Sequence, residues 1–169
     1  MNNTVRIAFS VLLIAGVAAC AKKKIKPEPV DTNQQTTETH AADTTGRYTR
    51  DSLDTDSCLR QRVVYFDLDQ TMIKPEFQAQ IACHAAYLRQ FPEARVRLEG
   101  NADERGSREY NLGLGERRGN AVSGAIQGNG GGAAQMSVVS YGEERPVCSD
   151  SSEDCWQKNR RVEIVYTVK

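Results

Sequence analysis

Hydrophobic and polar positions divide the chain into three stretches. Residues 7–17 form a continuous apolar run, residues 21–57 show no apolar periodicity, and short periodic segments follow from residue 58 to the end. Because every element of a folded core needs an apolar face, we expect the folded domain at residues 58–169. A domain of about 110 residues is long enough to bury one modest core.

The periodic segments predict alternating strands and helices. Apolar runs or apolar–polar alternation favour strands at residues 63–66, 95–99, 136–141 and 161–168. A helix is expected between the first two of these strands, and another between the second and the third. The order βαβαββ predicts an α+β two-layer sandwich, in which helices pack on a mixed sheet.

The first helix is indicated by one apolar face. Phe77, Ile81, Ala85 and Leu88 recur at spacings of four, four and three residues, which places them on one side of a helix. Pro92 follows and cannot continue the helix. We therefore expect this helix to pack on the sheet and to end before Pro92.

The second helix has an inner face that Leu112, Gly119, Val122 and Ile126 can supply, and another face that carries polar side chains. Ser107 is a suitable N-cap, and the glycine-rich run 128–132 marks the end. Leu114 and Arg118 follow Asn111 by three and seven residues, so the three side chains share one side of this helix. If this helix packs back on the sheet, Arg118 points beside the loop that precedes the helix, which indicates a binding site there.

The first twenty residues resemble an export signal. Arg6 precedes the apolar run 7–17, which is too short to be a permanent membrane span. Small residues and then Cys20 follow, a pattern that resembles the bacterial lipobox, whose cysteine carries the lipid. We expect a signal peptide at 1–19 and a lipidated Cys20. Since Ala21 stands where retained lipoproteins carry aspartate, that resemblance implies the outer membrane; an ordinary signal with a chance cysteine is the alternative.

Residues 20–57 are expected to form the lipidated N-terminus and a flexible tether. This stretch is rich in Thr, Asp, Gln and Lys, and such a composition cannot bury enough apolar surface to offset the entropy of the chain. It opens with Lys22-Lys23-Lys24-Ile25-Lys26. These lysines either lie against anionic lipid head groups or only keep the linker soluble.

Five cysteines are present, and lipidation of Cys20 leaves four of them. Export to an oxidising compartment permits disulfides, and four cysteines allow three pairings. We favour Cys148–Cys155, which bracket a short polar loop, with Cys58–Cys83 as the second pair. No CxxC spacing is present, so a cysteine-bound metal is not expected.

Charge and histidine content limit the possible functions. The formal net charge is zero, which gives no electrostatic case for binding nucleic acid. The two histidines are His40 in the tether and His84 on the first helix, where we expect it half-buried and hydrogen-bonded. Neither lies in a nucleophile–base pattern, so we expect no enzyme and no cofactor.

Six short motifs run through the folded part of the chain, at residues 65–67, 99–106, 110–111, 115–118, 139–146 and 158–161. The longest reads Glu99-Gly100-Asn101-Ala102-Asp103-Glu104-Arg105-Gly106. Together they resemble the OmpA-like domain family, and in particular its lipid-anchored members in the Tol–Pal system. The resemblance covers nearly the whole folded domain.

The resemblance implies a domain that binds meso-diaminopimelate in the stem peptide of peptidoglycan and tethers the outer membrane to the cell wall. It also implies docking of TolB and other Tol proteins, on a surface that overlaps the wall site. Diaminopimelate ends in an ammonium and a carboxylate. Asp103 matches the family's ammonium-binding acid, and Arg118 matches the arginine that pairs with the carboxylate. We expect both side chains at the surface of the free protein.

Further wall-contacting positions match Leu68, Asp69, Arg105 and Leu114, and Asn111 is added from the shared helix face. Three positions depart from the family pattern. Leu68 replaces an aromatic residue, Gly115 replaces serine, and Gly119 replaces alanine. Glycine inside a helix costs up to about 1 kcal/mol relative to alanine.

Two other functional classes remain as alternatives. An enzyme acting on the wall would need a catalytic arrangement that the sequence does not suggest. A motor subunit or a porin with the same domain would need a transmembrane helix or a barrel ahead of it, and residues 21–57 predict neither.

Overall fold

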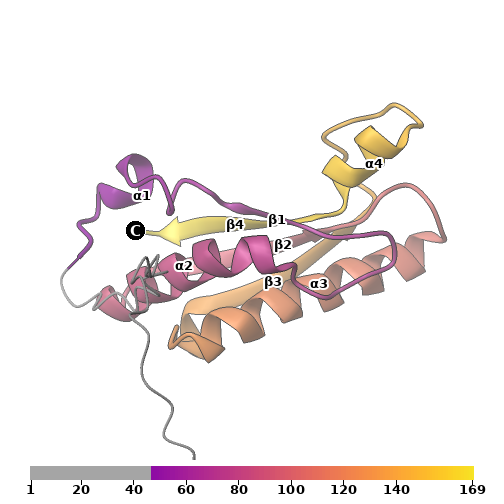
Figure 1. Cartoon of the computed structure of the whole chain (residues 1–169). Coiled ribbons are helices and arrows are strands. Elements are labelled where there is room, and N and C mark those ends of the chain that lie inside the picture. The colour runs from indigo at the N-terminus through magenta and orange to yellow at the C-terminus, as the bar shows by residue number, and fades with distance from the viewer. Residues whose placement is uncertain (1–46) are drawn as a thin grey trace, which may run out of the picture. The chain divides into compact units, whose positions relative to one another are not determined.

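A mixed four-stranded sheet forms one layer of the domain, and the computed structural model describes residues 47–169 (Figure 1). The strands are β1 (Val63–Tyr65), β2 (Arg95–Asn101), β3 (Met136–Gly142) and β4 (Arg161–Val168), in the spatial order β1-β4-β2-β3. β4 is antiparallel to both of its neighbours, and β2 is parallel to β3. The two central strands therefore run in opposite directions, and the start of β4 lies beside the end of β2.

Two long helices form the second layer, on one face of the sheet: α2 (Gln78–Gln90) and α3 (Arg108–Gly128). Four short elements complete the described chain: α1 (Ser52–Thr55), η1 (Pro75–Phe77), η2 (Ala133–Gln135) and α4 (Glu153–Asn159). The side chain of Ser107 accepts a hydrogen bond from the backbone of Tyr110, which confirms Ser107 as the N-cap of α3. None of the helices in this part of the chain is long and apolar enough to cross a membrane.

The core lies between the sheet and the two helices. Alternate residues of β2 and β4, such as Leu98 and Ile164, point into it. Ile81 and Leu88 of α2 and Ile126 of α3 meet them from the helical side. The helical spacing and the strand alternation of the sequence therefore identified the faces that are buried on folding.

The order βαβαββ is confirmed, with two additions and one change of boundary. The short helices α1 and α4 were not predicted. Tyr48 and Leu53 are buried in the core, so the folded domain begins before the expected boundary at residue 58. Too few apolar residues lie in this segment to produce a periodic pattern, but two large ones are enough to fix it. The signal peptide, Cys20 and residues 21–46 lie outside the described residues.

Helix α3 approaches the sheet closely because glycines face each other. A Cβ on Gly115 would lie 2.3 Å from the hydroxyl oxygen of Ser140 and 2.9 Å from the carbonyl oxygen of Gly100. A Cβ on Gly119 would lie 2.5 Å from a methyl carbon of Val138. The two glycines that depart from the family pattern therefore occupy positions where this chain has no space for a side chain.

Both favoured disulfides are present in the structure. Cys58–Cys83 joins the segment before β1 to α2, and Cys148–Cys155 closes the loop that leads into α4. Their sequence separations are 25 and 7 residues. The second bond holds the start of α4 to the segment that follows β3.

Candidate ligand-binding site

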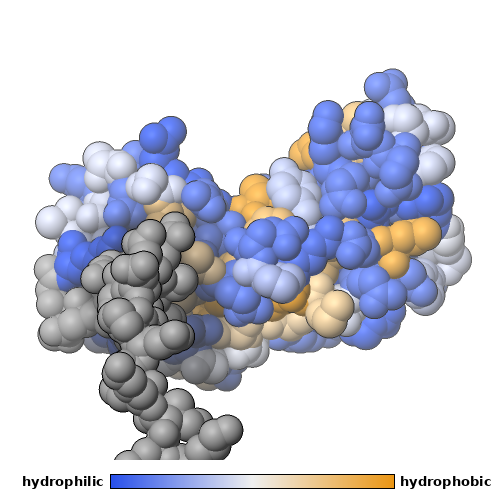
Figure 2. All heavy atoms as spheres, viewed as in Figure 1, coloured by the Kyte–Doolittle hydropathy of each residue, from blue (hydrophilic) through white to orange (hydrophobic). Residues whose placement is uncertain are grey.

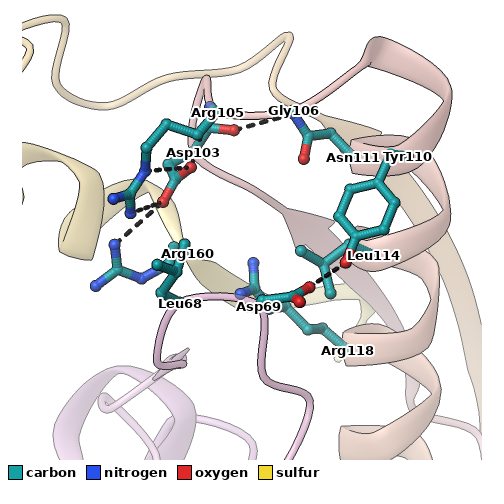
Figure 3. A pocket seen from close by; sticks show the side chains of 10 residues that line it. All are labelled: Leu68, Asp69, Asp103, Arg105, Gly106, Tyr110, Asn111, Leu114, Arg118 and Arg160. Atoms are coloured by element: carbon teal, nitrogen blue, oxygen red, sulfur yellow. Dashed lines mark hydrogen bonds and ion pairs between the residues drawn. The ribbon is translucent and has the colours of Figure 1, made fainter.

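A pocket of about 350 Å³ opens where β2 ends and α3 begins. Its walls come from the loop after β1, the loop between β2 and α3, one face of α3, and the residue that precedes β4 (Figure 3). The lining residues are Leu68, Asp69, Asp103, Arg105, Gly106, Tyr110, Asn111, Leu114, Arg118 and Arg160. All seven binding residues that the sequence indicated are among them.

Arg118 is fully buried at the base of this pocket, with 0% of its surface exposed. Its Nε, Nη1 and Nη2 atoms donate to the backbone carbonyls of Gln70, Asn101 and Asp67, at 2.9, 2.9 and 3.0 Å. A guanidinium has five N–H groups, so two of them have no acceptor among the described residues. Burial and then repulsion from Arg160 lower the pKa of Arg118 to about 10, which still leaves it charged at neutral pH.

Asp103 is buried beside two arginines, with 4% of its surface exposed. It accepts from the backbone and the side chain of Arg105, at 2.7 to 3.2 Å, and from Nη1 of Arg160 at 3.1 Å. Burial raises the pKa of this carboxyl, but the hydrogen bonds from both arginines outweigh burial and hold the pKa below its ordinary value. Asp103 is therefore ionised and fully hydrogen-bonded in the free protein.

The loop after β1 supplies an acid and an apolar residue to the mouth of the pocket. Asp69 has a positive φ of 57°, a conformation that aspartate tolerates better than most residues. Its carboxylate accepts a hydrogen bond from the hydroxyl of Tyr110 on α3. Leu68 is 51% exposed and covers the opening from the same loop.

The inner face of α3 completes the wall. Asn111 donates to the backbone carbonyl of Asp103 at 3.2 Å and to the carboxylate of Glu143. Leu114 is buried between Asn111 and Arg118 on the same side of the helix. Asn111 therefore fixes the loop that carries Asp103, and Leu114 provides an apolar surface to the pocket.

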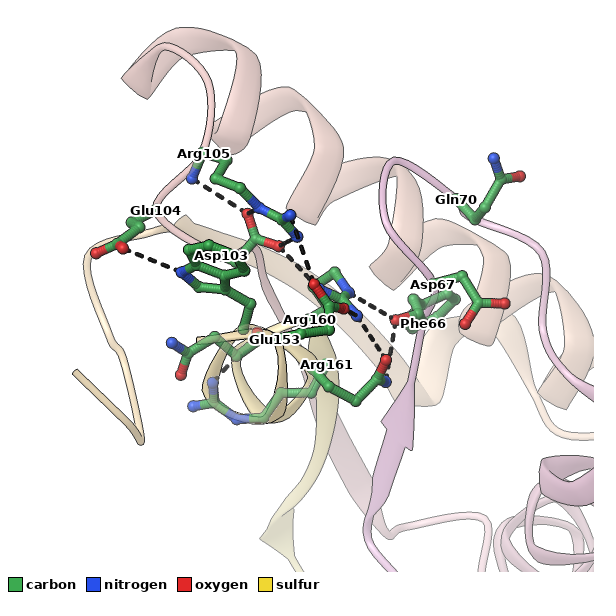
Figure 4. Close-up of polar contacts among 12 residues, drawn as sticks. Phe66, Asp67, Gln70, Asp103, Glu104, Arg105, Glu153, Arg160 and Arg161 are labelled. Carbon is green, nitrogen blue, oxygen red and sulfur yellow. Dashed lines mark hydrogen bonds and ion pairs between the residues drawn. The ribbon is translucent and has the colours of Figure 1, made fainter. Parts of the chain in front are cut away.

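Helix α4 supports the arginines that hold Asp103 (Figure 4). Glu153 accepts from Arg160 at 2.6 Å and forms a longer ion pair with Arg105 at 3.5 Å. The guanidinium of Arg105 lies 4.1 Å from the ring centroid of Trp156, whose indole N–H donates to Glu104 at 3.0 Å. This small helix therefore determines where both arginines lie.

The structure corrects one expectation about Asp103 and Arg118 and also excludes a simple ion pair between them. They are not bonded to each other, since one is held by arginines and the other by backbone carbonyls. Neither lies at the surface. The sequence could not show this, because aspartate and arginine are almost never fully buried unless their groups are paired.

Three lining residues were not selected from the sequence: Gly106, Tyr110 and Arg160. Tyr110 and Arg160 do lie in motifs that carry the family resemblance. Arg160 precedes β4 and meets the end of β2 only because the two central strands are antiparallel. That pairing is not visible in a single sequence.

The pocket offers charges of both signs. Three arginines and two aspartates line it, which leaves one excess positive charge. Figure 3 shows Asp103, Arg105 and Arg160 on one side and Asp69, Tyr110 and Arg118 on the other. Such a pocket can bind a small group that carries both a carboxylate and an ammonium.

The one histidine in the described part of the chain lies away from this pocket. His84 is fully buried, deeper than the half-buried position that we expected. Its Nε2–H donates to the carbonyl of Gln61, and its Nδ1 accepts from the hydroxyl of Tyr166, both at 3.0 Å. Residues 47–169 contain no cluster of three or more side chains suited to a metal ion.

Comparison with known proteins gives consistent matches. The model of the OmpA family matches residues 65–160. The chain is 37% identical over 166 residues to the peptidoglycan-associated lipoprotein of Haemophilus influenzae, covering 98% of this chain and 100% of that protein. The crystal structure of the peptidoglycan-associated lipoprotein from Burkholderia pseudomallei superposes with a TM-score of 0.67 and 43% identity, over 69% of this chain and 98% of that one.

A more distant likeness concerns the fold alone. The C-terminal domain of Helicobacter pylori MotB superposes with a TM-score of 0.58 at 22% identity, over 63% of this chain and 84% of that one. The Haemophilus influenzae relative, by contrast, matches the N-terminal stretch of this chain as well as the domain. The chain therefore belongs to the OmpA family and, within it, to the peptidoglycan-associated lipoproteins.

Proposed function

We propose that this pocket binds the free end of diaminopimelate in the stem peptide of peptidoglycan, and that the domain thereby tethers the outer membrane to the cell wall. The names of the relatives support association with peptidoglycan. The chemistry of the pocket supports the particular residue. Diaminopimelate presents an ammonium and a carboxylate on one carbon, and the pocket holds an acid and at least one arginine on each of its two sides.

The observation that carries the proposal is the state of Arg118. A buried guanidinium with two unused N–H groups in a pocket favours a carboxylate strongly, because the site is already desolvated and the planar guanidinium can donate to both carboxylate oxygens. Phe66 lies under the guanidinium, 5.2 Å from its ring centroid, and the three backbone carbonyls restrict its rotation. The arginine is therefore preorganised for a carboxylate.

The ammonium end of the ligand needs a rearrangement at Asp103. A carboxylate offers about four acceptor positions, and Arg105 and Arg160 already use four. The side chain of Arg105 is 32% exposed, whereas that of Arg160 is 3% exposed. Arg105 is therefore the partner that can move away from Asp103. Its guanidinium can remain stacked on the ring of Trp156 when the ammonium of the ligand replaces it.

The same geometry favours binding over catalysis. His84 is bonded inside the core, and burial lowers its pKa to about 4, so it is not placed to act on a ligand in the pocket. The acids that line the pocket are either saturated by arginines or bonded to Tyr110. We therefore propose a binding module that works without cofactor.

The membrane anchor and the protein partners are part of the same proposal. We propose that Cys20 carries the lipid that anchors the chain in the outer membrane. TolB and other Tol proteins are proposed as partners on the rim of the pocket, where Leu68 and Tyr110 are exposed. Wall and TolB would then exclude each other, and a ternary complex at saturating concentrations would contradict the overlap.

Isothermal titration calorimetry with three stem tetrapeptides tests the pocket. One contains meso-diaminopimelate, the second contains the same residue with its side-chain carboxylate amidated, and the third contains lysine. We expect the first to bind about tenfold to a hundredfold more tightly than either of the others, because a charge-assisted hydrogen bond is worth about 1.5–3 kcal/mol.

The matched protein variant is Arg118→Lys, with circular dichroism as the folding control. It keeps the charge but loses the planar fork, so it should no longer distinguish the acid from the amide. Equal affinity of the wild type for the acid and the amide would mean that Arg118 does not bind the carboxylate.

A further inference from the structure

A second groove, of about 550 Å³, lies between the end of β1, the turn η1 and helix α4. Figure 2 shows this face of the domain hollowed between the part that carries α1 and the part that carries α4, with hydrophobic residues visible in the hollow. None of the residues that line the groove lines the first pocket. The family motifs assign it no ligand.

Two aromatic rings form the apolar part of this groove. The ring centroids of Tyr65 and Phe77 are 6.2 Å apart, and the ring planes are tilted by 52°. Both residues are half-buried and line the groove, so part of each ring is accessible from it. Flat aromatic surface with a polar edge suits ligands that are themselves partly apolar and partly polar.

The charged residues along the rim cancel. Lys74 and Lys158 face Glu76 and Asp154, two positive charges against two negative ones. Lys74 also forms an ion pair, at 2.6 Å, with Asp67, which does not line the groove. The groove therefore has no excess charge that would select a phosphate, a carboxylate or a basic peptide. It offers polar donors and acceptors around an aromatic surface, which suits an uncharged polyhydroxyl ligand.

One short wall separates the groove from the first pocket. The carbonyl of Phe66 accepts from Nε of Arg160, which lines the pocket, at 3.1 Å, and from Nε2 of Gln157, which lines the groove, at 3.2 Å. The chain then continues through Asp67 to Leu68 at the mouth of the pocket. A ligand that fills the pocket and extends over this wall enters the groove.

We propose that the groove binds an N-acetylated amino sugar of the glycan strand to which the bound stem peptide is attached. The proposal rests on the proposed function, since the pocket places the peptide beside the groove. A sugar ring has an apolar C–H face that packs on Tyr65 and Phe77, and hydroxyl and acetamido groups that reach the rim. The protein then recognises peptide and glycan together.

The test compares two ligands on the full-length protein by isothermal titration calorimetry. One is the free stem tetrapeptide with meso-diaminopimelate, and the other is the same peptide bearing its disaccharide. We expect the disaccharide form to bind the wild type about tenfold more tightly, which corresponds to about 1.4 kcal/mol. Tyr65→Ala and the exposed Lys158→Ala should each reduce this gain and leave the affinity for the free peptide unchanged.

Tyr141→Ala is the control, because Tyr141 is a partly buried aromatic residue of β3 that lines neither site. It should preserve the tenfold gain. Equal affinity of the wild type for the two ligands would overturn the proposal and would fit a groove that serves a protein partner. Equal weakening of both ligands by Tyr65→Ala and by Lys158→Ala would overturn it as well.

Failure of the proposed function has a different signature. Binding of the disaccharide form without binding of the free peptide would retain the groove and contradict the diaminopimelate pocket. Binding of neither ligand would overturn both proposals.

Discussion

Arg118 and Asp103 carry full charges inside the domain, where burial is costly unless each charge is well paired. The two charges have different kinds of hydrogen-bond partner. Arg118 is held by three carbonyls and keeps two N–H groups for a ligand, whereas Asp103 is saturated by Arg105 and Arg160. The two residues that the resemblance marked for binding are therefore also structural residues of the free protein.

This dual role predicts that Asp103→Asn destabilises the fold. It removes one buried negative charge and leaves Arg105, Arg118 and Arg160 facing one another, so we expect a loss of about 3–5 kcal/mol in urea unfolding. Because the pKa of Asp103 is lowered in the folded state, its contribution is present above about pH 4 and is lost as the pH falls further. Leu68→Ala, at an exposed position, is the control and should change stability by less than about 0.5 kcal/mol.

His84 predicts a second pH dependence in a separate range. Burial lowers its pKa from 6.5 to about 4, so the unfolded chain binds the proton more readily than the folded one. The stability that the neutral ring provides is complete above about pH 6.5 and decreases by about 3 kcal/mol as the pH falls to about 4. Urea unfolding between pH 4 and 7 should show this slope in the wild type. A similar slope in His84→Gln would assign it to other groups.

At the scale of elements, the sequence predicted those helices and strands whose own residues form an apolar periodic pattern. Strand β4 was predicted with its observed bounds because Val162 and Ile164 alternate with polar residues and face one core. Helix α4 was missed because its seven residues are mostly polar, and it is held by a disulfide and by contacts with Arg105 and Arg160. These contacts depend on single side chains, and the ion pair of Glu153 with Arg105 joins distant parts of the chain, so they leave no periodic pattern in the sequence.

The packing of α3 on the sheet can be tested through its glycines. Gly115→Ala would place a Cβ 2.3 Å from Ser140 and 2.9 Å from the backbone of Gly100, so we expect a loss of about 1–3 kcal/mol. Gly124, in the same helix, has nothing within 4 Å of an added Cβ. Gly124→Ala should therefore stabilise the protein by about 0.5–1 kcal/mol. Thermal unfolding of the two variants distinguishes the effects, and stabilisation by Gly115→Ala would contradict the close approach.

Removal of either disulfide should lower the stability of the domain, but removal of only one of them should weaken ligand binding. Loss of Cys58–Cys83, whose cysteines are 25 positions apart, should cost about 3.5 kcal/mol in the loop-entropy model, and loss of Cys148–Cys155, 7 positions apart, about 2 kcal/mol. Only the second bond holds α4 beside Arg105 and Arg160. We expect the double alanine variant of that pair to bind the diaminopimelate peptide about tenfold more weakly, and the other double variant to bind as wild type does. The opposite order of affinities would show that α4 does not position the site.

At the scale of the whole domain, the candidate pocket and the first described residues of the chain lie at opposite ends of the sheet. β4 begins beside the pocket and ends next to the N-terminal segment, where Lys169 bonds Asp54 at 2.9 Å (Figure 1). Eight residues of β4 at about 3.3 Å each separate the two ends by roughly 25 Å. The described chain therefore begins on the side away from the pocket, as a bridge between membrane and wall requires.

Sedimentation of the wild-type protein with purified sacculi tests the central claim most directly, because it needs no variant that could misfold. Sacculi with meso-diaminopimelate and sacculi with lysine at the same position differ by the one carboxylate that Arg118 is proposed to bind. The account predicts that the protein sediments with the diaminopimelate sacculi at least about tenfold more tightly than with the lysine sacculi. Equal binding to the two walls would contradict it.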